Sequence, residues 1–393
     1  MKQPLSGIKI VDVTSVMAGP YCTMLLGDLG AEVIKIEPPS GDMIRKSPPF
    51  IEGESTYYLY TNRNKRSMTL NLRAEEGREI LLKLVKDADI FVENYKPQTK
   101  TRLKIDYPIL KEINPRLIYC SVSGFGQTGP WSERPGFDQI AQGMSGLMSV
   151  TGFPDSAPTR VGVAIGDSVA SLFAAYGILA ALIERNTSGR GQYLETSLLE
   201  GLIAVLGFQA AKYFGTGAPP LPQGNDHASF APYGTYKTKN GHINIAAATG
   251  RMWQNLCEIL GLEELTDDPK FKTMLKRVKN KDRLRETMEK KLSKKTNAEW
   301  IDILNEGGIA CGSINRIDQV FNDDHVRQRE MLMEVEHPLA GMIKLIGFPV
   351  KMGRTPCQIQ HPPPYLGQHT NDILTELNFS VEEINNLKQN DVI

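Results

Sequence analysis

The chain has few of the residues that build metal sites and disulfide frameworks. Its 393 residues include five cysteines and six histidines, and neither type shows the spacing of a zinc site, such as Cys-x-x-Cys or His-Glu-x-x-His. The cysteines are scattered and odd in number, which argues against structural disulfides. The sequence therefore predicts no bound metal and a reducing, cytoplasmic compartment.

Charge of one sign is not in excess either. Lysine plus arginine and aspartate plus glutamate each number 45, and 41% of the residues are hydrophobic. Without a net field to draw the chain onto nucleic acid or an anionic membrane, we expect neither as a partner. The basic stretch at residues 270–295 lacks usefully interleaved aromatic residues and is interpreted as a solvated surface. The expected partners are small molecules or a second copy of the chain.

Long apolar runs and nucleotide-binding motifs are also missing. The first residues lack the apolar segment of a signal peptide, and Gly, Ser or Asp interrupts the longest apolar runs, so we expect a soluble protein. Residues 124–129 have Gly-x-Gly-x-x-Gly spacing but open no apolar helix, and no Walker loop or Gly-x-Ser-x-Gly is present. These absences argue against a dinucleotide enzyme, a P-loop nucleotidase and a serine hydrolase.

Alternating strand and helix patterns fill the first half of the chain. Strands are predicted at residues 8–13, 32–37, 89–94 and 117–122, and helices at 21–29 and 75–86. Such alternation is typical of an α/β fold with a parallel sheet and right-handed crossovers. A last helix is expected at 372–377.

The length exceeds that of one ordinary core and predicts two domains. Residues 215–222 are rich in Gly and Pro and are interpreted as a linker at the end of a first domain, 1–215. Beyond it, two β-patterned segments flank an Asn-Gly turn at residues 236–245, which predicts a hairpin and the start of a smaller α+β domain.

Asp167 is the one charged side chain in the apolar stretch 164–183, which has the length of a core helix. Its position after a glycine, near the expected helix start, favours a carboxylate that caps free backbone amides. A carboxylate held there can also act as a covalent nucleophile. The two interpretations are compatible, and local sequence alone favours the cap.

Longer stretches of sequence resemble the family III CoA-transferases, which also contain the α-methylacyl-CoA racemases. The resemblance extends over essentially the whole chain. The matching segments are 5–14, 18–20, 29–37, 41–45, 64–67, 92–95, 114–116, 123–126, 166–167, 177–182 and 187–192.

This resemblance implies a Rossmann-like large domain with a parallel sheet, built from both chain ends, and a smaller α+β domain. The large domain then comprises 1–215 and 326–393, the latter including a return linker, and 216–325 holds the first linker and the small domain. It further implies a homodimer whose two subunits interlock as rings.

The resemblance also implies that Asp167 is the catalytic nucleophile. Its carboxylate would attack an acyl-CoA donor to give a mixed anhydride, and then carry CoA as an aspartyl-CoA thioester to a free carboxylic acid. Coenzyme A enters only as part of a substrate, and no permanently bound cofactor is needed. The positions expected to contact CoA are Met17, Ala18, Leu70, Arg73, Asn94, Tyr95, Lys96, Arg102, Phe137 and Asp138. The chain departs from the family pattern at Pro38 and Pro135, where relatives carry basic residues.

Phe137 distinguishes transfer from racemisation. The racemases use a histidine in a Gly-His-Asp motif as a second acid/base group, whereas this chain has Phe137 between Gly136 and Asp138. A phenyl ring cannot exchange a proton, so transfer is favoured over racemisation. An inactive CoA-binding homologue is a further alternative, against which the retained Asp167 argues.

Within the family, the chain resembles the succinyl-CoA-dependent dicarboxylate transferases, among them succinate–hydroxymethylglutarate CoA-transferase. The donor expected on that basis is succinyl-CoA or a similar dicarboxylyl-CoA. The four-glycine loop of the formyl-CoA enzymes is absent, and residues 224–234 occupy its place. His227 in this segment is predicted to help shape the acyl pocket.

Overall fold

The computed structural model describes residues 2–393, which form two compact units. The first unit runs to Leu147 and also includes Val161–Ala211 and His325–Ile393. The second comprises Met148–Arg160 and Lys212–Asp324. The sequence did not set residues 148–160 apart from the large domain.

A six-stranded sheet forms the centre of the first unit. Its order is β5 (Lys65–Thr69), β2 (Glu32–Glu37), β1 (Lys9–Asp12), β6 (Ile90–Glu93), β7 (Ile118–Ser123) and β8 (Tyr193–Ser197), and all neighbours are parallel. This confirms the expected α/β fold with a central parallel sheet. The order reverses between β1 and β6, and in open parallel sheets such a switch point leaves a crevice at the carboxyl ends of the strands.

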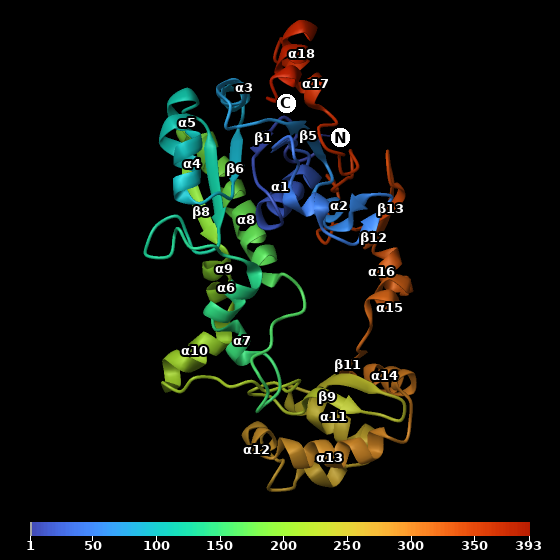
Figure 1. Cartoon of the computed structure of the whole chain (residues 1–393). Coiled ribbons are helices and arrows are strands. Elements are labelled where there is room, and N and C mark those ends of the chain that lie inside the picture. The colour runs from blue at the N-terminus through green and yellow to red at the C-terminus, as the bar shows by residue number, and fades with distance from the viewer. Residues whose placement is uncertain (1) are drawn as a thin grey trace. The chain divides into compact units, whose positions relative to one another are not determined.

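Helices cover both faces of this sheet because both faces are apolar (Figure 1). One face packs against α1 (Ala18–Asp28), α6 (Asp138–Met144), α8 (Ile165–Ser188) and α9 (Leu198–Val205). The other packs against α3 (Glu75–Lys86), α5 (Tyr107–Ile113), α17 (Thr370–Glu376) and α18 (Val381–Gln389), with α4 (Pro97–Leu103) nearby.

The expectation that the helix at 372–377 is the last one is wrong. After α17 the chain turns through Asn378, which has a positive φ of 65°, and α18 follows. Ser380 starts α18 with a capping box in which its side chain and that of Glu383 bond each other's backbone amides. Apolar Ile384 and Leu387 then bury against the sheet-facing core, which stabilises this short helix.

The remaining elements of the first unit lie beside the sheet. They are η1 (Met43–Lys46), β3 (Phe50–Ile51), β4 (Glu54–Ser55), α2 (Thr56–Thr61), β12 (Leu332–His337) and β13 (Gly341–Ile346). The chain passes between the units within α7 (Leu147–Val150), α10 (Gly207–Thr216) and α16 (Asp324–Gln328), and near residue 160.

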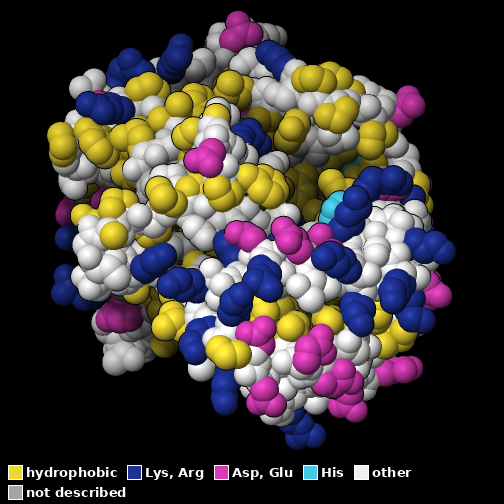
Figure 2. All heavy atoms as spheres, turned by 90° about the horizontal axis from the view of Figure 1, so that it is seen from below, with side chains coloured by type: hydrophobic (Ala, Val, Ile, Leu, Met, Phe, Trp, Pro, Cys, Tyr) yellow, Lys and Arg dark blue, Asp and Glu magenta, His cyan; other side chains and the backbone are white. Residues whose placement is uncertain are grey.

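The second unit contains the predicted hairpin. Strands β9 (Tyr233–Lys237) and β10 (His242–Ala246) pair antiparallel, and β11 (Ala310–Ser313) adds a third strand. Its helical elements are α11 (Gly250–Leu260), η2 (Glu263–Thr266), α12 (Met274–Lys279), α13 (Lys281–Leu292), α14 (Asn297–Glu306) and α15 (Ile317–Asn322). The basic stretch forms α12 and α13, and on the face seen in Figure 2 the Lys and Arg side chains are interspersed with Asp and Glu.

Candidate active site

Asp167 lies in the first turn of α8 but does not cap that helix. The helix begins at Ile165, and Ala164 at the N-cap position makes no side-chain bond to it. Among residues 2–393 no donor is hydrogen-bonded to the Asp167 carboxylate. The local interpretation of Asp167 as a cap is therefore wrong. Its carboxylate, partly exposed and without a structural partner, is available for chemistry.

Asp138 performs the capping instead, from the start of α6. Its Oδ1 accepts the Gly166 N–H at 2.8 Å, and its Oδ2 accepts Gln142 Nε2 at 2.7 Å. The side-chain oxygen of Gln142 in turn accepts the Val161 N–H at 2.9 Å. A Cβ at position 166 would lie 3.0 Å from Asp138 Oδ1, so glycine lets the cap approach closely. Asp138 was expected to contact CoA, whereas here both its oxygens are engaged within the protein.

The surroundings of Asp167 change its acidity. Burial, together with the nearby negative charge of Asp138, raises the pKa of Asp167 from 3.8 to about 7. Both causes disfavour the charged form. A carboxylate of this kind is more basic than usual and is poised to become ionised near neutral pH. Such a shifted pKa without a stabilising partner is common at catalytic positions.

Three segments meet close to Asp167 at the carboxyl edge of the sheet. Ser171, one turn further along α8, places its hydroxyl 2.6 Å from the carbonyl oxygen of Ala18 and 2.7 Å from that of Asp167. The side chain of Asn94, after β6, exchanges two hydrogen bonds with Ser15, after β1: it accepts the Ser15 N–H at 3.0 Å and donates to its carbonyl at 2.8 Å. The loops after β1 and β6 are thus fastened together at the switch point.

The other residues expected to contact CoA differ in what they offer. Arg73, Lys96 and Arg102 are exposed. Arg73 follows β5, Lys96 follows β6 and Arg102 lies on α4, so their charges are free to meet anionic groups. Leu70 is 1% exposed and packs in the core below α3, which leaves only its backbone for a ligand. Asn94 is engaged with Ser15 through its side chain.

The remaining predicted residues are split between the two units. Met17 is the N-cap residue of α1, and Tyr95 is half-buried. Burial and the charge of Glu93 raise the pKa of Tyr95 to about 12. Phe137, just before α6, is 62% exposed. His227 lies in the second unit, where its ring packs against Phe230 and Tyr233 and its Nδ1 accepts the Ser229 N–H at 3.0 Å.

Sequence reasoning missed a group of fully buried charges at the same edge of the sheet. Asp12 on β1 accepts Lys65 Nζ at 3.0 Å, and Lys35 on β2 donates to Asp42 at 3.1 Å. Burial alone would raise the pKa of Asp12, but the Lys65 and Lys35 ammonium groups and two threonine hydroxyls lower it to about 2. The available signal was Asp12 directly after the apolar pair Ile10 and Val11, and Lys35 between Ile34 and Ile36.

Comparisons with known proteins agree with this architecture. Residues 5–370 match the family model described as CoA-transferase family III. The chain is 41% identical to succinyl-CoA:glutarate CoA-transferase of Mus musculus, covering 95% of this chain and 86% of that protein. It is 37% identical to succinate–glutarate CoA-transferase of Agrobacterium fabrum, covering 96% of both. A solved structure of a CaiB/BaiF family protein from Brucella suis superposes with a TM-score of 0.86 at 36% identity, covering 96% of this chain and 100% of that one.

Proposed function

Since this chain belongs to CoA-transferase family III and is a CoA-transferase, we propose that it moves CoA from succinyl-CoA to a second dicarboxylate, with Asp167 as the nucleophile. The observation that carries the role of Asp167 is its unpartnered, basic carboxylate at the carboxyl edge of the sheet. Both relatives compared with this chain have succinate or succinyl-CoA together with glutarate in their names, which supports glutarate as the first acceptor to test.

The proposed reaction needs no external acid, base or redox partner. An Asp167 oxygen attacks the thioester carbonyl of succinyl-CoA, the C–S bond breaks, and CoA leaves as a thiolate with its electron pair. That thiolate attacks the Asp167 carbonyl carbon of the mixed anhydride and releases succinate, which leaves an aspartyl-CoA thioester. The acceptor carboxylate then expels the thiolate to form a second anhydride. Attack of the thiolate on the acceptor's acyl carbon regenerates the Asp167 carboxylate.

The exposed cations around the carboxyl edge suit the CoA moiety. Arg73, Lys96 and Arg102 carry the charge that the nucleotide phosphates require, and arginine binds phosphate through two parallel hydrogen bonds. Met17 and Ala18, and the backbone at Leu70, Asn94 and Tyr95, contribute to the same surface in this proposal. The exposed ring of Phe137 lies at the start of α6, next to Asp138.

A panel of substrates tests the proposed function. Purified protein is mixed with succinyl-CoA and each of several carboxylates, and new acyl-CoA species are detected by mass spectrometry. Formation of glutaryl-CoA with release of succinate is expected. An inactive homologue transfers nothing to any acceptor. The same reactions run in D₂O test for abstraction of an α-proton: an unlabelled α-carbon in the product shows that none is exchanged, whereas deuterium at that carbon would contradict the assignment based on Phe137.

Asp138→Asn is expected to shift the pH dependence of transfer. Protonated Asp167 is not nucleophilic, so kcat/KM should fall as the pH drops through about 7 in the wild type. Asparagine retains an oxygen for the Gly166 N–H but lacks the negative charge that helps to raise the pKa of Asp167. The acid limb should therefore move about one pH unit lower, with burial accounting for the remaining shift.

Rates measured between pH 5 and 9 would show this displacement. Asp89→Asn is the matched control, because Asp89 contacts the other end of α8 through Arg185 at 2.7 Å. Its acid limb should coincide with that of the wild type. An acid limb that Asp138→Asn leaves in place would contradict a Coulombic influence of Asp138 on Asp167.

A homodimer is part of the same proposal. Helix α8 is long and apolar enough to span a bilayer by composition, yet one side of it packs in the core through Ala170, Ala174 and Ile178. On its other side Leu172, Tyr176 and Ile183 are 55%, 71% and 72% exposed. An exposed apolar face of this size is typical of an interface, and we assign it to a second, interlocked subunit.

Light scattering after gel filtration should give twice the mass of one chain for the wild type. Tyr176→Glu combined with Ile183→Glu should lower that mass to one chain or prevent assembly, because charge is then placed in the buried interface. Val381→Glu, an equally exposed apolar position on α18, is the control and should remain dimeric. A monomeric wild type, or one recovered with membranes, would contradict the proposal. Interlocked subunits should also fail to exchange when tagged and untagged dimers are mixed.

A further inference from the structure

The turn that follows β1 contains an unfavourable backbone conformation. Val16 has a φ of 69°, and it is the one β-branched residue among the non-glycine residues with positive φ in the described part of the chain. A β-branched side chain is disfavoured there because it crowds the backbone, and such conformations persist only where their surroundings impose them. They also occur preferentially at functional sites.

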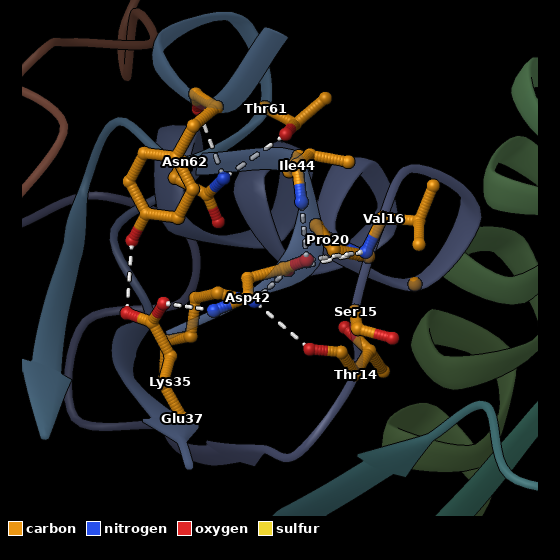
Figure 3. Close-up of polar contacts among 12 residues, drawn as sticks. Thr14, Ser15, Val16, Pro20, Lys35, Glu37, Asp42, Ile44, Thr61 and Asn62 are labelled. Carbon is orange, nitrogen blue, oxygen red and sulfur yellow. Dashed lines mark hydrogen bonds and ion pairs between the residues drawn. The ribbon is translucent and has the colours of Figure 1, made fainter. Parts of the chain in front are cut away.

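Asp42 is hydrogen-bonded to the backbone of Val16 (Figure 3). Its two carboxylate oxygens lie 3.2 and 3.1 Å from the Val16 nitrogen, so both accept the same N–H. Lys35, which is fully buried, donates to Asp42 at 3.1 Å and to the Thr14 carbonyl oxygen at 2.8 Å. The buried Lys35–Asp42 ion pair thus contacts the turn at two backbone groups that lie two residues apart, the Thr14 carbonyl and the Val16 N–H.

Asp42 is itself fixed before it meets the turn. Its own N–H is accepted by Glu37 at 3.1 Å, and its Oδ1 also caps η1 by accepting the Ile44 N–H at 3.2 Å. Glu37 is held in turn by two hydrogen bonds of 2.7 Å from Arg45. Asp42 is only 3% exposed, so its position is determined by these bonds and not by solvent.

The turn lies where a ligand is expected on topological grounds. It follows β1 at the reversal of strand order, and Asn94 after β6 fastens Ser15 from the other side of that point. Two residues beyond Val16, the Ala18 carbonyl meets Ser171 on α8, one helical turn from Asp167. The backbone conformation of Val16 therefore sets where Met17 and Ala18 lie relative to the proposed nucleophile.

We propose that Asp42 and Lys35 are positioning residues, which hold Val16 in the left-handed conformation so that residues 15–18 form the acyl-CoA-binding turn beside Asp167. The inference rests on the proposed function for the identity of the ligand. Neither side chain touches the reacting atoms in this proposal. Their effect reaches the substrate only through the backbone of the turn.

The test combines Asp42→Asn with Val16→Gly. Glycine adopts positive φ at little cost, so a turn with glycine at position 16 depends less on the carboxylate. In the wild-type background, Asp42→Asn should raise the KM for succinyl-CoA on the order of 10-fold and leave the KM for the acceptor unchanged. In the Val16→Gly background, Asp42→Asn should also raise the KM for succinyl-CoA, but the fold increase should be at least about three times smaller than in the wild-type background.

A purely structural ion pair would give a different result. Loss of folded enzyme lowers the apparent kcat but leaves both KM values of the surviving molecules as they were. Asp28→Asn is the matched control, because Asp28 is also 3% exposed and pairs with buried Arg63 at 2.7 Å, away from the turn. It should change neither KM. An Asp42→Asn effect confined to kcat, or equal in both backgrounds, would overturn the proposal.

Two measurements keep the test independent of turnover. Hydrogen exchange of amides in residues 15–18 should accelerate about 10-fold or more in Asp42→Asn and stay unchanged in Asp28→Asn. Calorimetric binding of CoA should weaken in parallel. If Asp42→Asn alone is insoluble, the double variant with Val16→Gly should be recovered folded, and its equal insolubility would count against the proposal. A wild type that transfers no CoA would refute the proposed function, while exchange and CoA binding would still decide the role of Asp42.

Discussion

Replacing Asp167 by Asn or Ala is expected to lower kcat by at least about 10³-fold, because the covalent route loses its nucleophile. Asn preserves shape and polarity but cannot form the anhydride. Since the carboxylate makes no structural hydrogen bond, the fold and the affinity for CoA should be retained. Single-turnover mixing with succinyl-CoA, followed by mass spectrometry of the intact protein, should detect acyl or CoA adducts on the wild type and none on either variant.

The same substitution should stabilise the protein at neutral pH. In the folded protein the pKa of Asp167 is raised from 3.8 to about 7, so its contribution to stability is fully present below pH 3.8. That contribution is lost as the pH rises from 3.8 through 7. Asparagine does not ionise, so Asp167→Asn should be more stable than the wild type by about 1–2 kcal/mol at pH 8, after allowance for partial solvent screening. The difference should vanish near pH 4. Retained turnover, or an unfolding midpoint that falls, would contradict the assignment of Asp167.

Asp12→Ala is expected to have the largest effect on stability. It leaves the Lys65 ammonium group buried without its counter-charge and removes the acceptor for two threonine hydroxyls. Breaking one partner of a buried ion pair costs about 3–5 kcal/mol. The loss should fall on the first unit, because all of these residues lie in it.

Hydrogen exchange in β1 and β5 would measure that loss without contribution from the second unit. Adding Lys65→Met to Asp12→Ala should restore part of the protection, since the second charge is then also removed. The control is Asp318→Ala, which breaks a pair on the exposed surface and should leave exchange unchanged. Equal protection in Asp12→Ala and the wild type would refute the role of this pair.

The pH dependence of the Asp12 contribution has the opposite sign to that of Asp167. Its folded pKa of about 2 lies below the ordinary 3.8, so its stabilisation is present above pH 3.8 and disappears as the pH falls towards 2. The gap in stability between wild type and Asp12→Ala should therefore close over that interval. Lowering the pH should thus remove both differences in stability, but in different pH ranges. For Asp12→Ala the wild type loses its advantage between pH 3.8 and 2, whereas for Asp167→Asn the variant loses its advantage between pH 7 and 4.

The sequence pattern predicted helices and strands correctly where a single physical requirement determines the element. The helix at 75–86 was predicted to the residue, because its apolar stripe has an unambiguous 3.6-residue period. The hairpin at 236–245 followed from its Asn-Gly turn. Strand β5 was missed, because its Lys65 and Arg66 obscure a strand whose charges pair with Asp12, Glu32 and Glu376, which lie far away in sequence.

The sequence by itself determined the α/β class and, through its long family resemblance, the CoA-transferase assignment, because periodicity and extended motifs are written along the chain. Only the tertiary structure decided that Asp138 caps α8 and leaves Asp167 unpartnered, and that Asp42 accepts the Val16 N–H. These pairs are 28 and 26 residues apart. Burial and charge act through space, so which groups share one site becomes fixed only when the strands align and their carboxyl ends meet at a single edge.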